Sequence, residues 1–420
     1  MAYCEDKRFG ILIACFRSNC SALDKVNKES KYIVKISAQT DLSEALFDYS
    51  ECFFEAAYKI SESILYPTYP DIGKLDTYFF SIAFLYRHCI ELGLKAIGFQ
   101  YIQNEDDRAK FVKTTKHDLS AILSVVTRKC ACSRPVDELS WLQKYFSDLS
   151  QMDRESDSFR YPFHIIRNPN TREFDIKKVF DHQIHIDLIK FANKFIAAYE
   201  IIKKWYDNDN KTANEWKKLS PIFIETGGYY YGQSVVGYKH NNAQFFPYTK
   251  AYLETANFLK KCMRQETDNG KNNEHLFLPM CYLYRNCVEL SLKTILFDEI
   301  DECFQMKCKC MQDKKHSIIG MWNKLEPYIA RNASESNDEE YLSVIADYCK
   351  QIHKIDSDAN IFRYPMSKDM RPYFSSNKRF DFIEIGDFFE ALNNGLAGID
   401  SQLKYLREEK TEKEYYINHL

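Results

Sequence analysis

Two stretches of this chain repeat arginine, glutamate and lysine at four-residue intervals, a pattern that can bind or orient charged groups. The first reads LYRHCIELGLK over residues 85–95, and the second reads LYRNCVELSLK over residues 283–293. Residues four apart share one face of a helix, so each stretch predicts a plus-minus-plus ladder opposite an apolar, buried stripe. The ladder residues are Arg87, Glu91 and Lys95 in the first stretch, and Arg285, Glu289 and Lys293 in the second.

The two ladder glutamates admit a functional and a structural interpretation. In the first, each Glu orients a nucleotide or an arginine that binds phosphate. In the second, each Glu pairs with the Arg or Lys of its own helix and with an arginine that arrives from a later loop. That arginine is Arg160 in one half and Arg363 in the other, each within a Phe-Arg-Tyr-Pro motif. The sequence leaves both interpretations open.

Histidines and tyrosines add further candidate ligand-binding residues. His117 and His316 each begin a predicted helix, where they bind a ligand or serve as caps and core contacts. Tyr161 and Tyr364 stack on a base or pack in the core. His88 has Asn286 at the matching position, so any chemistry at His88 belongs to one half only.

The elements that must position these residues occur twice. The ladder, the histidine and the Phe-Arg-Tyr-Pro motif recur in the same order at nearly equal spacing, which predicts an internal duplication. We therefore expect an all-α protein of two tandem helical bundles with a short hairpin-like connector. The predicted parts are an N-terminal lead (1–45), a first helical domain (46–206), a linker with a small hairpin (207–245), a second helical domain (246–407) and a charged tail (408–420).

Local signals place several elements within this plan. Residues 31–36 alternate weakly, like a strand, and residues 10–14 form a short apolar run. Asp41 to Glu44 is a capping box that opens a helix to about Leu65, before two prolines. Residues 221–236 predict a hairpin, and the last helix of the first half is expected from about Asp175 to Tyr206.

Composition excludes several classes of protein. The formal net charge of −3 does not fit a protein that coats itself with nucleic acid, although local basic patches remain open. Fourteen scattered cysteines without an apolar leader indicate reduced thiols in the cytoplasm. No long uncharged apolar run predicts a membrane span. The Cys-x-Cys pairs at 130–132 and 308–310 lack zinc-site spacing, so we expect neither metal nor cofactor.

The order of these motifs resembles the HEPN superfamily of small helical bundles. Members of its nucleotide-binding type show E-x-x-L-K, then H-x-L, then R-Y-P. Both halves of this chain match that order over roughly residues 48–206 and 246–406. The resemblance implies a bundle of four to five helices in each half, and a family of metal-independent endoribonucleases and partners in toxin–antitoxin and phage-defence systems.

The family's active site implies a chemistry that this sequence matches incompletely. In the family, an Arg is followed by a His after four to six intervening residues. The His takes the 2′-hydroxyl proton and the Arg stabilises the phosphate. Here Arg160 and His164 have three residues between them, and no His closely follows Arg363. A composite site of Arg160, His164 and Arg363 is the resulting catalytic hypothesis.

The functional prediction is thus an RNA-acting defence effector, with a possible endoribonuclease activity that the missing spacing leaves undecided. The alternative is a catalytically inactive module that binds a nucleotide, an RNA or a partner protein. A homo-oligomer stays open as well.

Overall fold

The computed structural model describes residues 29–129, 135–209, 214–237, 245–271, 274–332 and 336–418, and these residues are mostly helical. The predicted all-α fold is confirmed. The elements of the first half are β1 (Ile33–Ile36), α2 (Leu42–Leu65), α3 (Ile72–Tyr101), α4 (Glu105–Thr115), α5 (Leu119–Lys129), α6 (Val136–Asp153), β2 (Phe163–Arg167), β3 (Phe174–Lys178), β4 (Ile184–Asp187) and α7 (Leu188–Asp207).

The rest of the chain adds the remaining elements. They are the 3-10 turns η1 (Glu215–Lys218), η2 (Tyr230–Gly232) and η3 (Glu274–Leu276), β5 (Gln233–Val236), α8 (Phe246–Asp268), α9 (Phe277–Thr294), the π-turn η4 (Ile295–Glu299), α10 (Phe304–Lys314), α11 (Ile318–Asn332), α12 (Ser336–Ile355), β6 (Lys378–Asp381) and α13 (Phe382–Asn418). Within the described residues, no helix is long and apolar enough to cross a membrane.

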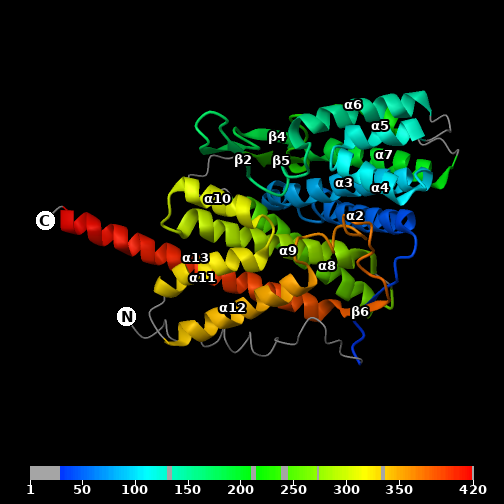
Figure 1. Cartoon of the computed structure of the whole chain (residues 1–420). Helices are drawn as coiled ribbons and strands as arrows, with labels where there is room; N and C mark the ends of the chain where they lie inside the picture. The colour runs from blue at the N-terminus through cyan, green and yellow to red at the C-terminus, as the bar shows by residue number, and fades with distance from the viewer. Residues whose placement is uncertain are drawn as a thin grey trace.

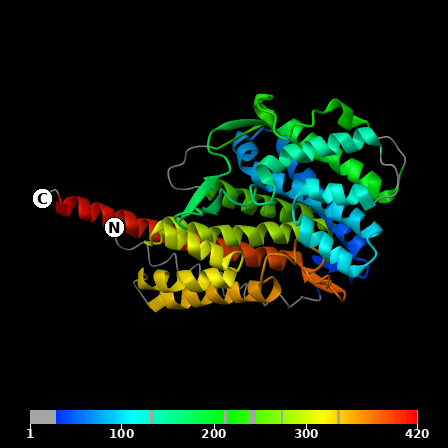
Figure 2. The ribbon, with the colours of Figure 1, turned by 45° about the horizontal axis from the view of Figure 1, so that its top comes forward.

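Helix α3 lies at the centre of the molecule. It packs against α2, α5 and α7 of its own half and against α8 of the other half. Helix α9 packs against α8, α11 and α13. Buried side chains from both halves form one continuous hydrophobic cluster. Figures 1 and 2 show the first-half helices on one side, the yellow-to-red second-half helices on the other, and α13 projecting beyond the body.

Local capping explains where several helices begin. The Asp41 carboxylate accepts hydrogen bonds from the backbone amides of Ser43 and Glu44, which confirms the predicted start of α2. Asp71 caps α3 in the same way through the Lys74 amide. Because Pro67 and Pro70 lie between these helices, the chain turns there instead of continuing one long helix.

The predicted strand at the N-terminal lead is confirmed, and its partner lies far away in the sequence. Strand β1 pairs antiparallel with β6, with Ile33 opposite Asp381 and Ile36 opposite Lys378. This pairing joins the beginning of the described chain to the segment before the last helix. The apolar run at residues 10–14 lies outside the described residues.

Two predicted elements are wrong. Residues 221–236 do not form a hairpin with themselves; β5 pairs instead with β4, which precedes α7. The hairpin is β2–β3, with Phe163 opposite Lys178, and β3 lies where the prediction placed the start of a long helix. The last helix of the first half begins only after Asp187, whose carboxylate accepts from the Lys190 amide and caps it.

Candidate functional site

The ladder of α3 is buried on every side. Arg87, Glu91 and Lys95 are each at most 2% exposed, so the expectation of a charged face opposite a core face is wrong. The Glu91 carboxylate pairs with Arg87 Nη1 at 2.7 Å and with Lys95 Nζ at 2.7 Å. Arg87 also reaches the Asp153 carboxylate at 2.9 Å. Charges survive burial here because each one has an opposite partner within hydrogen-bond distance.

The ladder of α9 repeats this arrangement. Glu289 pairs with Arg285 and, at 2.7 Å, with Lys293. Arg285 Nε lies 3.2 Å from the Asp356 carboxylate. Pairing of each glutamate with the Arg and Lys of its own helix, the structural interpretation above, is therefore what the structure shows.

The arginine of the Phe-Arg-Tyr-Pro motif does not arrive at the glutamate, which corrects the second part of that interpretation. The tyrosine beside it does, and it comes from the opposite half. Tyr364 donates its hydroxyl proton to Glu91 at 2.9 Å, and Tyr161 donates to Glu289 at 2.6 Å. Each half therefore supplies the tyrosine that contacts the glutamate of the other half.

Each glutamate also holds a histidine. His117 Nδ1 lies 3.0 Å from Glu91, and His316 Nδ1 lies 3.0 Å from Glu289. The side chains of His117 and His316 are 31% and 35% exposed, unlike the ladder itself. Since Glu engages Nδ1, the other nitrogen of each ring, Nε2, is left for solvent or a ligand.

The structure thus builds two mixed clusters, each with residues from both halves. The first cluster is Glu91, His117, Arg363 and Tyr364, and the second is Glu289, His316, Arg160 and Tyr161. Together they form what we call the seam.

The two arginines of the seam lie beside the same aromatic ring. The guanidinium carbons of Arg160 and Arg363 are 5.9 Å and 5.7 Å from the centre of the same ring, Phe84. Both arginines are nearly buried, at 3% and 4% exposure. Both guanidinium groups therefore contact the same aromatic ring, and the composite site of Arg160, His164 and Arg363 stays a prediction.

The two arginines differ in their counterions. Arg160 forms an ion pair with Asp157, three residues earlier, whereas the matching position before Arg363 is Asn360. Among the described residues, no carboxylate pairs with Arg363. Its Nη2 donates to the Tyr364 hydroxyl at 3.2 Å, and its Nε has no hydrogen-bond partner. Arg363 is thus a buried cation without a carboxylate counterion among the described residues.

Asp157 is a site residue that the sequence reasoning missed. Burial raises the pKa of its carboxyl, but the charges of Arg160, His316, His117 and Arg363 outweigh burial and lower it. Its side chain is 37% exposed, at the surface of the seam. An acid three residues before Arg160 was the available signal, and the repeat hid it because the second half has an amide there.

Electrostatics fix the protonation of the clusters. Burial raises the pKa of Glu91 and of Glu289, but the neighbouring Lys, His and Arg lower both well below the usual value. Burial lowers the pKa of His117 more than Glu91 raises it. Glu289 raises the pKa of His316, yet burial, Arg160 and Lys293 lower it overall. Both imidazoles are therefore mainly neutral at pH 7.

His88 and His164 lie at the margins of this arrangement. His88 is fully buried, and its Nε2 is 3.0 Å from the Arg363 carbonyl oxygen, so it supports the loop that carries Arg363. His164 lies on β2 and contacts the Ser158 hydroxyl at 3.3 Å. Among the described residues it forms no hydrogen bond with either seam arginine.

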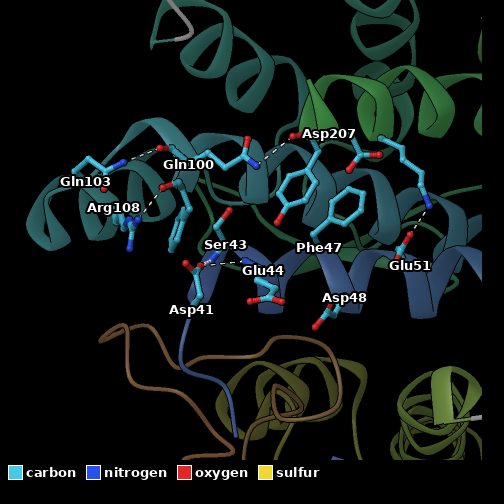
Figure 3. A pocket seen from close by; sticks show the side chains of 13 residues that line it. Asp41, Ser43, Glu44, Phe47, Asp48, Glu51, Gln100, Gln103, Arg108 and Asp207 are labelled. Carbon is cyan, nitrogen blue, oxygen red and sulfur yellow. Dashed lines mark hydrogen bonds and ion pairs between the residues drawn. The ribbon is translucent and has the colours of Figure 1, made fainter. Parts of the chain in front are cut away.

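A separate polar pocket of about 690 Å³ opens where the start of α2 meets the ends of α3 and α7 (Figure 3). None of the seam residues lines it. Five acidic and two basic side chains line it, and one of the basic ones, Lys203, already pairs with Glu51. This pocket therefore does not suit a phosphate. The acidic residues are Asp41, Glu44, Asp48, Glu51 and Asp207.

Metal ligands are not gathered anywhere in the described part of the chain. No group of three His, Cys, Asp or Glu there could hold an ion. Cys308 and Cys310 are buried on α10, and the pair at 130–132 lies outside the described residues.

In comparisons with known proteins, no family model, curated protein or solved structure matches this chain. The resemblance to the HEPN superfamily stays a prediction from the motifs.

Proposed function

We propose that the protein binds RNA phosphate at the seam and cleaves the phosphodiester without a metal ion, as an effector of the HEPN type. The observation that carries this proposal is Arg363, a buried guanidinium without a carboxylate partner among the described residues, next to a histidine oriented by a glutamate. A phosphate oxygen is the ligand that such a guanidinium takes best.

The two histidines suit a two-proton reaction. One neutral imidazole takes the proton of a 2′-hydroxyl, and the resulting oxygen attacks phosphorus. The other, protonated when the bound phosphate raises its pKa, gives a proton to the departing 5′-oxygen. The products are a 2′,3′-cyclic phosphate and a 5′-hydroxyl. The arginines stabilise the additional negative charge on the phosphorane.

Cleavage of RNA in EDTA tests this proposal directly. His117→Gln and His316→Gln should each lower the rate by about 10²-fold or more, the usual contribution of a general acid or base. Arg363→Ala should abolish cleavage, whereas Arg331→Ala, at an exposed site on α11, should leave it unchanged. Undiminished cleavage by both histidine variants contradicts the proposed roles.

A sharper variant uses the difference between the clusters. Asn360→Asp places a carboxylate beside Arg363, at the position that Asp157 takes beside Arg160 in the other half. This counterion should compete with phosphate and weaken RNA binding at the seam. Asp157→Asn frees Arg160 and should do the opposite. If both substitutions leave binding and cleavage as in the wild type, the seam arginines are not the phosphate site.

One observation favours the alternative of a binding module. Arg160 and Arg363 are only 3% and 4% exposed, so they reach a small anion more easily than a scissile bond deep within a long chain. Calorimetry with mononucleotides distinguishes the two: nucleotide binding that Asn360→Asp abolishes, without any cleavage of RNA, favours the module.

A further inference from the structure

The β2–β3 hairpin and α10 form one continuous surface beside the seam. Gln305 of α10 accepts a hydrogen bond from the Phe174 amide at 2.7 Å and donates one to the Phe174 carbonyl at 2.8 Å. Figure 1 shows the strands directly next to α10. The side chain of Gln305 therefore attaches the hairpin to α10 through two hydrogen bonds to the backbone of β3.

This surface carries a concentrated positive charge. Residues 163–178 and 304–315 together contain eight basic and three acidic residues, a net charge of +5 in a chain of net charge −3. Seven of the eight basic side chains are exposed; Lys307 is partly buried and donates to the Phe297 carbonyl. The exposed ones are Arg167, Arg172, Lys177, Lys178, Lys309, Lys314 and Lys315.

None of these seven cations forms an ion pair with a carboxylate within the described residues. Some exposed lysines elsewhere form such pairs, as Lys190 does with Glu225 and Lys203 with Glu51, whereas others within the described residues, such as Lys110, do not. The cations of this surface are therefore available to an external polyanion, and neutralising them would relieve their mutual repulsion.

Both ends of the surface meet the seam. Strand β2 begins two residues after Tyr161, and Lys315 directly precedes His316. The Tyr161 hydroxyl lies 3.1 Å from His316 Nδ1, so the hairpin and α10 converge on the second cluster. A chain bound along this surface is led to the exposed edge of His316.

The corresponding segments on the other side of the seam are less positively charged. Residues 105–116 and 366–381 together contain eight basic and five acidic residues, a net charge of +3. One of the eight, Arg108, donates to the backbone carbonyls of Phe99 and Ile102. The side of His316 therefore carries two more net positive charges than the side of His117.

Exposed apolar side chains stand among the cations. Phe304, Met306 and Ile166 are 37%, 47% and 46% exposed on α10 and β2. Single-stranded RNA offers both bases that pack on such side chains and phosphates that pair with the lysines. A duplex, whose bases are stacked inside, would leave these apolar groups in water.

We propose that the β2–β3 hairpin and α10 form a track for the backbone of single-stranded RNA, which enters the seam from the side of His316. This rests on the proposed function, since the same RNA would be the substrate. It adds a binding surface outside the seam and a direction of approach.

Binding of a fluorescent 20-nucleotide single-stranded RNA, measured by anisotropy over a salt series, tests the track. The double variant Lys177→Glu/Lys314→Glu should bind about tenfold more weakly or worse at moderate salt, and its salt dependence should fall by about 0.7 per lost phosphate contact. The matched control is Lys110→Glu/Lys113→Glu on α4, which makes the same charge change on the other side and should bind like the wild type.

The outcomes separate the track from the proposed function. Arg363→Ala should keep the salt-dependent RNA binding of the track while losing cleavage. Wild-type binding without any cleavage overturns the proposed function and leaves the track standing. The track is overturned if the wild type does not bind this RNA at low salt, or if the α4 control weakens binding equally. It is also overturned if vesicles with anionic lipid, or polyglutamate, bind in place of RNA.

Discussion

Glu91 shows how four groups share one buried carboxylate. It accepts from Arg87, Lys95, His117 and the hydroxyl of Tyr364, the last from 273 residues away in sequence. Removing this charge would leave the buried Lys95 without a carboxylate partner and Arg87 with Asp153 alone, and loss of one partner of a buried pair typically costs about 3–5 kcal/mol. The same carboxylate thus pairs with buried cations and orients the imidazole that the proposed reaction uses.

His88 gives the molecule a predictable response to acid. Burial, and then the charge of Arg363, lower its pKa well below the usual value, although Glu91 opposes this shift. Below pH 6.5 the His88 side chain of the unfolded chain therefore binds a proton, whereas the buried His88 of the folded chain stays neutral. The stability from this group is present above pH 6.5 and lost as pH falls.

Replacing His88 by Asn, the residue at the matching position of α9, should flatten the loss of unfolding free energy between pH 6.5 and 5. The change in slope should reach up to about 1.4 kcal/mol per pH unit, with the remaining slope due in part to His117 and His316. Urea unfolding at a series of pH values measures it. The exposed His353→Asn should keep the wild-type slope, and an unchanged slope in His88→Asn would contradict the assignment.

At the scale of elements, the contact of α3 with α2 and α7 depends on one missing side chain. A Cβ at Gly93 would lie 2.8 Å from Ile202 Cγ2 and 3.1 Å from Ser50 Oγ. Both neighbours are fully buried and close to their backbones. At the matching position α9 has Ser291, so the two ladder helices do not pack equally tightly.

Gly93→Ala should therefore destabilise the protein, because the overpacking costs about 1–3 kcal/mol while the gain in helix propensity is at most about 1 kcal/mol. Chemical denaturation measures the net change. Ser291→Ala, at the same place in α9, should change stability by much less. A Gly93→Ala variant more stable than the wild type would show that α7 moves freely away from α3.

The elements themselves divide into those that sequence could predict and those that it could not. The start of α2 was predictable because Asp41 caps it locally, and β1 was visible in its alternation. The β2–β3 hairpin was missed, since Asp175 to Lys178 carry no strong strand signal and gain their conformation by pairing with β2. Strand β5 was assigned to the wrong partner because β4 lies on the other side of α7 in sequence.

At the scale of the whole molecule, the two halves share a core and a seam. The repeat in the sequence singled out the glutamates, histidines and tyrosines of the seam, but not that each tyrosine contacts the glutamate of the opposite half. That crossing depends on contacts between residues 128 and 273 positions apart, for which no local pattern exists. The difference between Asp157 and Asn360, by contrast, lies only three residues before each arginine and is visible in the sequence.

The shared core predicts that the halves unfold together. Thermal unfolding followed by circular dichroism and by tryptophan fluorescence should give coincident transitions, although Trp141 and Trp205 lie in the first half, Trp216 in the connecting segment and Trp322 in the second half. Calorimetric and van't Hoff enthalpies should agree. Two separated transitions would mean that the packing of α3 on α8 and the two tyrosine contacts contribute little.

The crossed tyrosines also bear on how the two halves stay together. Because each half supplies the hydroxyl that completes the other, an isolated half could complete its own cluster only by meeting a second molecule. Because residues 207–245 join the two halves in one chain, that encounter is intramolecular, and its effective concentration is set by the connection and not by the protein concentration. The occupancy of both clusters therefore does not depend on how much protein a cell contains.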